Sequence, residues 1–292
     1  MSDLNFSIII PHYNIPKLLQ RCLDSIPQRP DLEVIVVDDN SSPDIVDFDH
    51  FPGSDRPDVT LILDKKGGGG GYARNLGLDA AKGKWLLFAD SDDYYVEGAF
   101  DVIDRELSDE IDILFFNIKL EGCWLTKFTS FHKSYEQYTV DGNSIPIRFG
   151  KWQPWNKVIS AKVVHDNKIR FEEVPVGNDA LFALNAAKYC ERYKIIQDRL
   201  YTYTSSNSGS LSQAKMDFNR LMLHTAVRVR INLFFAENGY YRLILLLLGR
   251  STIRSMIRNY GWRKTFIYFR YVKKYFGLGK YLRCRILKKL HL

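Results

Sequence analysis

The first third of the chain alternates between short apolar runs and longer segments whose apolar residues recur every three or four positions. Apolar runs of strand length occupy residues 6–10, 33–37, 59–63 and 85–89. Helix-spaced segments follow at 15–26 and 72–81. This alternation predicts βα units, and strands without a polar face predict a parallel sheet that helices cover on both sides.

Beyond residue 110 the pattern is mixed. Residues 111–118 and 193–197 predict strands, short β segments are expected as far as Phe131, and residues 179–189 predict a helix. From Gln213 the spacing is helical almost throughout, with breaks near three glycines: Gly239, Gly261 and Gly277. We therefore expect an α/β domain followed by a helical region.

Charge divides the chain near the same place. The 292 residues carry 41 Lys and Arg against 34 Asp and Glu, a net charge of +7. The last acidic residue is Glu237, and residues 238–292 hold 14 Lys and Arg with no Asp or Glu. The remainder has 27 basic and 34 acidic side chains and is net negative, so the two parts have different electrostatic roles.

Composition argues against several classes of protein. The four cysteines form no CxxC motif or Cys/His cluster, which argues against a zinc site and fits a reducing cytosol. The N-terminus lacks the apolar segment of a signal peptide. The longest apolar run, residues 243–248, is far shorter than the roughly 20 residues of a membrane span. No nucleic-acid-binding signature accompanies the basic tail, so no nucleic-acid partner is expected.

Two acidic clusters directly follow buried strands. Asp38 and Asp39 open the segment DDNSS at 38–42, and DSDD occupies residues 90–93. Both fall beyond the carboxyl ends of strands, where open parallel sheets bind ligands. Three carboxylates within four residues suit Mg²⁺ or Mn²⁺ shared with a diphosphate, and a carboxylate at 38–39 can accept hydrogen bonds from a base or ribose. Alternatively, each cluster is a strand-ending turn, and the second caps a helix that starts near Val96.

Two further segments offer groups for an anion and for a proton. Gly67 to Gly71 open the helix that carries Arg74, an arrangement that suits a phosphate; the alternative is a plain surface loop. Asp179 lies at the start of a predicted helix in GNDALF (177–182). Its carboxylate either caps that helix or removes a proton from an attacking hydroxyl, and the local sequence leaves both open.

The order and spacing of these segments resembles the inverting glycosyltransferases of family 2. The resemblance covers about residues 6–212 and rests on five segments: FSIIIPHYN (6–14), VIVVDDNS (34–41), ARNLG (73–77), AKGKWLLFADSDD (81–93) and GNDALF (177–182). WNK at 155–157, FE at 171–172, YTY at 201–203 and SGSLS at 208–212 also look like that family. The resemblance implies an α/β, GT-A type fold over residues 1–212, with a mostly parallel nucleotide-binding sheet in about 1–120 and an acceptor half in 121–212. A helical, basic region then occupies 213–292.

The resemblance also implies a role for each matching position. Binding of the nucleotide sugar would involve Pro11, Tyr13, Asp38, Asp39, Arg74, Asp90 and Ser91. Asp92 would ligate Mn²⁺ or Mg²⁺, and Asp179 would be the base of a single displacement with inversion. Trp155 and Asn178 would lie on the acceptor side. The implied donor is a nucleotide-diphosphate sugar, with a UDP-sugar favoured, and the implied acceptor is a hydroxyl of a glycan or lipid-linked glycan.

Two features depart from that family. Asn178 precedes the base where an acidic residue is usual, and five glycines replace a more varied loop. Two alternatives therefore stay open: an inactive nucleotide-binding module on the same fold, and a nucleotidyltransferase. If Asp179 is not the base, the next candidates are Glu172, Glu173 and Asp166.

The basic tail predicts either a membrane partner or an internal one. Arg250, Arg254 and Arg258 share one helix face, and aromatic residues mix with Arg and Lys between Trp262 and Phe276. Such helices suit the interface of an anionic membrane. We expect a cytoplasmic protein that attaches to the inner face of the cell membrane through residues 238–292, with packing on the acidic domain as the alternative.

Overall fold

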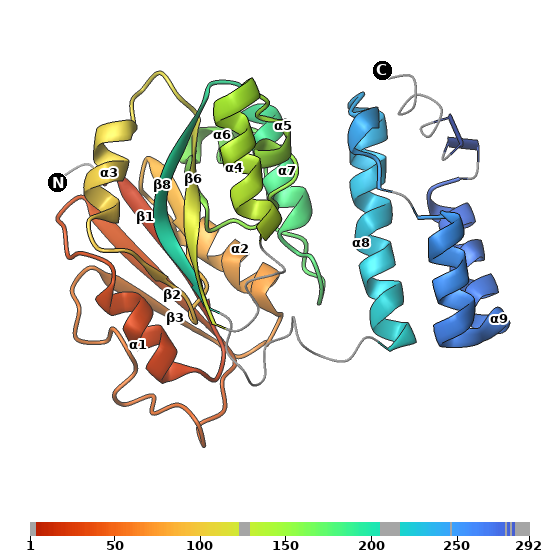
Figure 1. The fold of residues 1–292 in the computed structure, drawn as a ribbon. Helices are drawn as coiled ribbons and strands as arrows, with labels where there is room; N and C mark the ends of the chain where they lie inside the picture. Colours follow the sequence, from red (N-terminus) through yellow and green to blue (C-terminus); the bar gives the residue numbers. More distant parts are fainter. Residues whose placement is uncertain are drawn as a thin grey trace. The chain divides into compact units, whose positions relative to one another are not determined.

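The first unit of the computed structural model is organised around a sheet of eight strands (Figure 1). The structure describes residues 4–122, 129–204, 217–245, 247–277, 279–280 and 282–283. Within this part, the strands are β1 (Phe6–His12), β2 (Leu32–Asp39), β3 (Val59–Asp64), β4 (Trp85–Phe88), β5 (Tyr94–Tyr95), β6 (Ile113–Glu121), β7 (Lys157–Ser160) and β8 (Tyr193–Thr204). Their order in the sheet is β3-β2-β1-β4-β7-β6-β8-β5.

The strand directions define where a ligand site belongs. β1, β2, β3 and β4 run parallel, with Ile8 paired to Val34 on one side and to Leu87 on the other. The chain adds β2 and β3 on one side of β1 and β4 on the other, so the order reverses between β1 and β4. In an open sheet of this kind, ligands bind beyond the carboxyl ends of the strands at such a switch point. The segments that follow β1, β2 and β4 therefore frame the site.

The second half of the sheet is mixed, which the hydrophobic pattern did not predict. β7 is antiparallel to both β4 and β6, β6 is parallel to β8, and β5 is antiparallel to β8. The short β segments expected as far as Phe131 are wrong at residues 129–131, where a helix begins. In that helix Phe131 and Tyr135 are both buried and lie one turn apart, a helical spacing. Residues 123–128 lie outside the described part.

Helices cover both faces of the parallel strands, as predicted. The helices of this unit are α1 (Pro16–Asp24), α2 (Gly70–Ala80), α3 (Ala99–Glu106), α4 (Thr129–Asp141), α5 (Ile145–Arg148), α6 (Ala161–Asp166) and α7 (Ala180–Tyr189). Ile35 and Val37 of β2 pack with Ala73 of α2, whereas Val34 and Val36 belong to the main core with Leu19 of α1. Because neighbouring strand residues point to opposite faces, α1 and α2 lie on opposite sides of the sheet.

A glycine lets α2 approach the sheet closely. A Cβ on Gly77 would lie 2.4 Å from Cγ2 of Ile9 in β1. Any side chain at this position would therefore push α2 outward. The close packing fixes the direction in which the start of α2, and with it Arg74, points.

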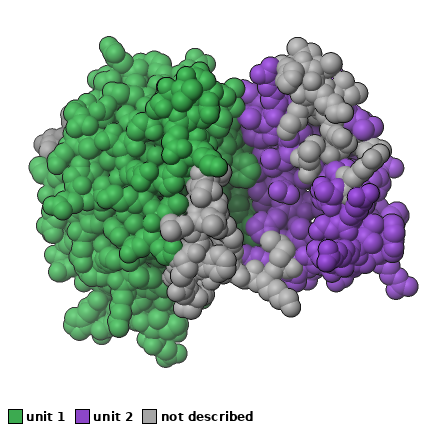
Figure 2. All heavy atoms as spheres, viewed as in Figure 1, with its two compact units in different colours: residues 1–210 green, residues 211–292 purple. Residues whose placement is uncertain are grey.

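The chain divides into two compact units, Met1–Ser210 and Leu211–Leu292 (Figure 2). The second unit contains α8 (Phe218–Glu237), the 3₁₀ helix η3 (Tyr241–Leu243) and α9 (Arg250–Tyr275). Asp217 caps α8 by accepting a hydrogen bond from Arg220 N at 2.7 Å. The three predicted breaks are confirmed, because Gly239, Gly261 and Gly277 all have positive φ. The SGSLS segment at 208–212 lies outside the described residues, and no described helix has the length and hydropathy of a membrane span.

Candidate active site

A buried hydrogen-bond network joins the ends of β1 and β2. The Asp38 carboxylate accepts hydrogen bonds from His12 Nδ1 at 2.8 Å, Ser41 N at 2.9 Å and Ser41 Oγ at 2.6 Å. Ile15 N donates to His12 Nε2 at 3.1 Å, so Nδ1 carries the proton that Asp38 accepts. Burial favours the neutral acid, yet the bonds from His12 and Ser41 outweigh it and hold the pKa of Asp38 below its usual value. The structure thus places Asp38 inside the protein, where it holds two loops together.

The same loops present other predicted residues outward. Asn14 and Asn40 adopt positive φ, and Ser42 N donates to Asn14 Oδ1 at 2.8 Å, which ties the segment after β1 to the segment after β2. Tyr13 is 58% exposed beside this link, and Pro11 is half-buried in β1. An exposed aromatic ring at the end of a central strand can stack on a base.

Asp39 differs from its neighbour because it keeps an unused oxygen. Its Oδ2 accepts a hydrogen bond from Gly69 N at 2.8 Å, whereas its Oδ1 is buried and has no partner in the described part of the structure. Burial raises the pKa of Asp39, and the backbone bonds from the glycine loop only partly offset this. A buried acceptor without a donor calls for a ligand that supplies one.

Arg74 connects segments that are remote in sequence. From α2, its guanidinium forms an ion pair with Asp90 after β4 and donates to Asn178 Oδ1 at 3.3 Å before α7. A Cβ on Gly71 would lie 2.2 Å from the carbonyl oxygen of Glu172, so glycine is required for α2 to start this close to the 172–178 segment. The glycine run is therefore more than a plain surface loop. Arg74 Nε is buried without a partner in the described part, which leaves one donor for an anion.

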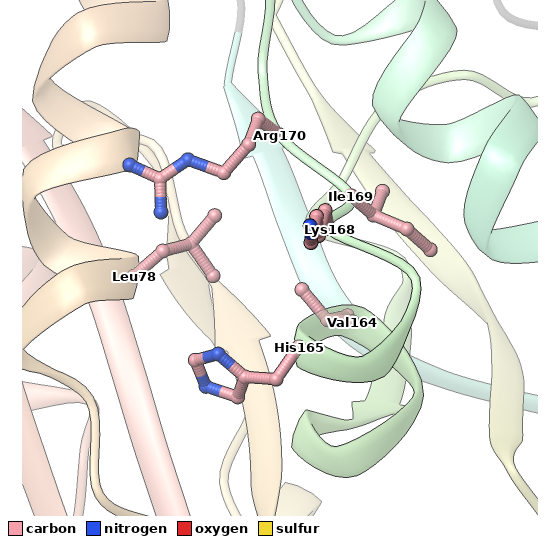
Figure 3. Close-up of a pocket in the computed structure, with 6 residues that line it drawn as sticks. All are labelled: Leu78, Val164, His165, Lys168, Ile169 and Arg170. Carbon is pink, nitrogen blue, oxygen red and sulfur yellow. The ribbon is translucent and has the colours of Figure 1, made fainter.

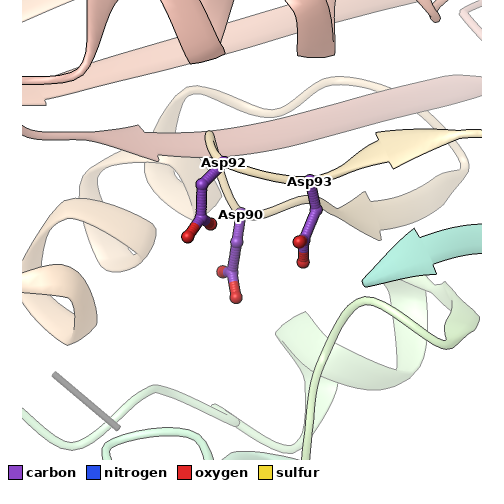
Figure 4. A group of neighbouring side chains, drawn as sticks. All are labelled: Asp90, Asp92 and Asp93. Carbon is purple, nitrogen blue, oxygen red and sulfur yellow. The ribbon is translucent and has the colours of Figure 1, made fainter. Parts of the chain in front are cut away.

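Three carboxylates gather after β4. Oxygens of Asp90, Asp92 and Asp93 all lie within 4.8 Å of one another (Figure 4). Burial, then the negative charge of Asp90, raises the pKa of Asp92 to about 6. Burial and the charges of Asp90 and Asp92 raise the pKa of Asp93 well above its usual value. Crowded carboxylates with raised pKa values suit a divalent cation, which would offset their repulsion.

The helix-capping alternative for this cluster is wrong. The next helix, α3, begins at Ala99 after Gly98, and no side chain caps it. The cluster is instead bonded to the end of β8, where Thr204 N donates to Asp93 Oδ1 at 2.7 Å. The other oxygen of Asp93, Oδ2, is buried without a partner among the described residues. Ser91, between the carboxylates, is buried. The unused oxygen of Asp93 adds this residue to the predicted metal ligands.

Asp179 begins α7 without capping it. The helix has no side-chain cap at this residue. Burial raises the pKa of Asp179, and the positive charges of Arg74 and Lys157 oppose the rise. A carboxylate that is not used in a cap remains free to accept a proton. Of the alternative bases, exposed Glu173 accepts a bond from Asn75, and exposed Asp166 is paired with Lys162.

Two supporting residues, Tyr201 and Arg21, had no role predicted from the sequence. Tyr201 accepts a hydrogen bond from Asp90 N at 2.9 Å, and its ring stacks on Trp155 at 5.3 Å. Trp155, expected on the acceptor side, is only 2% exposed and lies in the core. Arg21 of α1 donates to the carbonyl oxygen of Asp92 at 2.5 Å. The YTY and WNK segments were a signal for Tyr201, but nothing in the sequence links Arg21 to a residue 71 positions later.

Lys157 is a buried lysine whose charge acts on that of Asp179. Its Nζ donates to Lys151 O at 3.2 Å, to Asn156 Oδ1 at 2.7 Å and to Gln153 O. Burial lowers its pKa to about 7, and the charge of Asp179 works against that shift. The lysine thus holds the 151–156 loop and favours the ionised form of Asp179.

A pocket of about 210 Å³ lies away from these residues (Figure 3). It is lined by Leu78, Val164, His165, Lys168, Ile169 and Arg170. The guanidinium of Arg170 is ion-paired with Asp79, so its positive charge is already balanced. None of the predicted site residues lines this pocket, so it is not part of the site.

Comparison with known proteins agrees with the geometry. Residues 7–157 match the family described as glycosyl transferase family 2. The chain belongs to this family. The predicted family is therefore confirmed.

Relatives within the family cover most of the chain. EpsJ of Bacillus subtilis (strain 168), named an uncharacterized glycosyltransferase, is 27% identical over 225 residues, which are 71% of this chain and 62% of EpsJ. TarS of Staphylococcus aureus, named a poly(ribitol-phosphate) β-N-acetylglucosaminyltransferase, is 27% identical over 77% of this chain and 40% of its own length. The chain thus spans less than two thirds of the length of each of these two relatives.

Solved structures confirm the GT-A type fold. S. aureus TarS 1–349 has a TM-score of 0.64 at 20% identity, covering 88% of this chain and 73% of that one. TarS 1–349 in complex with UDP-GlcNAc has a TM-score of 0.62 at 21% identity, covering 95% and 93%. The mannosyltransferase PcManGT from Pyrobaculum calidifontis, in complex with GDP-Man and Mn²⁺, has a TM-score of 0.53 at 13% identity, covering 97% and 86%.

Proposed function

We propose that this chain transfers a sugar from a nucleotide-diphosphate sugar to an acceptor hydroxyl, with inversion at the anomeric carbon. The observation that carries the proposal is the position of Arg74. Its side chain bonds both Asp90 and Asn178, so one cation joins the acidic cluster to the segment that bears Asp179. A site for diphosphate departure and a site for proton removal thereby share one positive group.

The donor's nucleotide is bound at the ends of β1 and β2. Asp39 Oδ1 accepts an N–H of the base or a ribose hydroxyl, and the exposed ring of Tyr13 stacks on the base. The carboxylate suits the N–H donor of uracil, which thymine and guanine offer too, and we favour UDP among these nucleotides. The name of the TarS complex with UDP-GlcNAc supports the same choice.

A divalent cation fits the acidic cluster. Asp92 and Asp93, with Asp90, would hold Mn²⁺ or Mg²⁺, since their oxygens lie within 4.8 Å of one another and Oδ2 of Asp93 has no partner in the described part. When bound, such an ion offsets the charge of the departing diphosphate as a Lewis acid. Arg74 adds a fixed positive charge at the same place.

Asp179 is the base of the displacement. The acceptor oxygen forms a bond to the anomeric carbon while the bond from that carbon to the diphosphate oxygen breaks, and the diphosphate leaves with the electron pair. The acceptor proton passes to the Asp179 carboxylate, which has no capping bond to give up. Burial raises the pKa of Asp179, which makes it a better proton acceptor once ionised.

The acceptor is a hydroxyl of a glycan or of a lipid-linked glycan. TarS is named for poly(ribitol-phosphate). A Campylobacter jejuni relative, 28% identical over 72% of this chain and 68% of its own length, is named a GalNAc(5)-diNAcBac-PP-undecaprenol β-1,3-glucosyltransferase. These names support acceptors carried on polymers or lipids.

Turnover of a panel of nucleotide sugars by the purified chain tests the proposal. We expect hydrolysis or transfer from at least one UDP-sugar. Asp179→Asn should lower kcat roughly 100-fold or more while the affinity for UDP stays unchanged. Asp109→Asn, which removes an exposed carboxylate paired with Lys84, is the matched control and should behave as wild type.

Other outcomes would replace the proposal. UDP binding without turnover of any donor would indicate an inactive nucleotide-binding module. Release of pyrophosphate from a nucleoside triphosphate would indicate a nucleotidyltransferase. If Asp179 only starts the helix, Asp179→Asn should leave both the stability and the kinetics near normal, because its side chain makes no capping bond and Asn begins a helix as well as Asp does.

A further inference from the structure

The second half of α9 exposes apolar side chains on one face. The helix kinks at Gly261, whose φ is 79° and ψ is 168°. Directly after the kink, Trp262 is 74% exposed, Phe266 61% and Ile267 52%. Soluble surfaces rarely place three large apolar side chains within two turns of one helix.

The opposite face of this segment is buried. Thr265, Tyr268, Val272 and Phe276 are all buried, and the Tyr268 hydroxyl donates to Leu247 O at 2.7 Å. Asn232 of α8 holds Leu245 through bonds of 2.9 and 2.7 Å, which anchors the segment that precedes α9. Because these contacts all lie within the second unit, the exposed face of α9 has a defined orientation within that unit.

Basic residues flank the exposed apolar ones. At 100° per residue, Arg263, Arg270, Lys273 and Lys274 fall in the same arc as Trp262, Phe266 and Ile267, and all seven are exposed. The Arg270 guanidinium carbon lies 5.9 Å from the centre of the Phe266 ring. No acidic residue occurs anywhere in 238–292 to neutralise these charges.

We infer that this face of α9, residues 262–274, docks on an anionic lipid surface. The aromatic and aliphatic side chains enter the interface, while the long Arg and Lys side chains reach the phosphates above it. The charge complementarity is complete, because the face is basic throughout and lies in a region without carboxylates. A nucleic acid or another soluble polyanion would match the charge but would leave Trp262 and Ile267 in water.

Docking of α9 brings the proposed transferase to the membrane surface. Its benefit rests on the proposed function, because a lipid-linked acceptor lies at the same surface. Docking of α9 restricts the search of the enzyme for such an acceptor to two dimensions. The kink at Gly261 sets the direction of the docking face within the second unit, since the segment before it follows a different axis.

Flotation of the full chain with lipid vesicles tests the inference. Wild type should float with vesicles of phosphatidylglycerol and phosphatidylcholine, float less in high salt, and stay unbound with phosphatidylcholine alone. Trp262→Ala with Phe266→Ala should weaken partitioning about tenfold or more. Arg270→Gln, Lys273→Gln and Lys274→Gln together should weaken it on the order of 100-fold, about fivefold per charge.

Matched variants on the first unit serve as controls. Val140→Ser removes an apolar side chain that is 81% exposed on α4. Lys82→Gln, Lys133→Gln and Lys162→Gln together remove three exposed charges, the same number as the α9 variant. Both should float as wild type does. Hydrolysis of the donor, measured without vesicles, reports separately on the proposed function and on folding of each variant.

Several results would overturn the inference. Wild type that does not float, or α9 variants that float as wild type does, would show that this face does not bind lipid. Retention on heparin without vesicle binding would indicate a soluble polyanion as partner. A dimer that dissociates in the Trp262 and Phe266 variant, again without vesicle binding, would make the face a contact between copies.

Discussion

The acidic clusters at the end of β2 and directly after β4 have similar compositions and different surroundings. Both lie at the carboxyl end of a buried parallel strand, and both contain adjacent aspartates. Asp38 accepts three hydrogen bonds inside the protein, from His12 and Ser41. Asp92 and Asp93 are crowded with Asp90, and Oδ2 of Asp93 has no partner in the described part. Asp38 therefore stabilises the fold, whereas burial and mutual repulsion destabilise the charged forms of Asp92 and Asp93.

The hydrogen-bond donors and charges around a carboxylate, and not the residue type, decide its pKa and its role in this protein. Hydrogen bonds from His12 on β1 and from Ser41 just after β2 lower the pKa of Asp38 against the effect of its burial. Neighbouring carboxylates add to the effect of burial at Asp92 and raise its pKa to about 6. One substitution, Asp to Asn, should therefore have opposite consequences at the two places.

The largest expected effect is on turnover at the second cluster. Asp92→Asn should lower kcat about 100-fold or more, because the site loses a charged ligand for the cation. Chelation of divalent ions should abolish wild-type turnover, and Mn²⁺ or Mg²⁺ should restore it. Asp55→Asn, at an exposed aspartate, is the control. Full turnover in chelator would remove the metal from the mechanism.

The next effect is on stability at the first cluster. Asp38→Asn should lower the free energy of unfolding by about 2 kcal/mol, because the amide nitrogen faces donors from His12 and Ser41. Denaturant unfolding measures this directly. Asp92→Asn should not lower the stability of the metal-free protein, since it relieves repulsion. An equal loss of unfolding free energy in Asp38→Asn and Asp92→Asn would show that the two carboxylates do not differ in their effect on stability.

A smaller effect separates Asp39 from Asp38. Asp39→Asn should weaken UDP binding roughly tenfold, because it replaces a charged acceptor for the base or ribose. The change in kcat should be small, since the group does not contact the reacting atoms. Calorimetry with UDP gives the affinity. Wild-type affinity in this variant would exclude Asp39 from the nucleotide site.

A further effect is on how stability varies with pH. Burial and the charge of Asp90 raise the pKa of Asp92 from 3.8 to about 6, so the folded chain holds this proton more tightly than the unfolded chain between those values. The stability that the proton provides is lost as pH rises through this window. The advantage of Asp92→Asn over wild type should therefore grow from pH 3.8 to about 6 without metal and then level off. The ionised Asp38, whose pKa is lowered from 3.8, stabilises the folded chain, and this stabilisation is lost as pH falls below 3.8.

Local patterns were sufficient for the parallel half of the fold. Apolar runs predicted β1 to β4 and a sheet covered on both faces, and helical spacing predicted α1 and α2. The antiparallel placement of β7 between β4 and β6 was not predictable in this way, because strand direction depends on where the chain returns and not on the residues of the strand. The helix at 129–141 was missed because its turn-spaced Phe131 and Tyr135 lie in a segment of mixed polarity.

The family, the elements of the parallel half and the residue types that the site needs could be read from the sequence. Local pattern also located aspartates at the end of β2, after β4 and at the start of α7, because strand ends and helix starts are set locally. What each carboxylate does depends on its partners in the tertiary structure. His12 donates a hydrogen bond to Asp38, and the absence of a side chain at Gly71 lets Arg74 reach Asn178. Tyr201 accepts a hydrogen bond from the backbone of Asp90, 111 positions away. Such partners are remote in sequence, and hydrogen bonding and electrostatic coupling depend on distance in space.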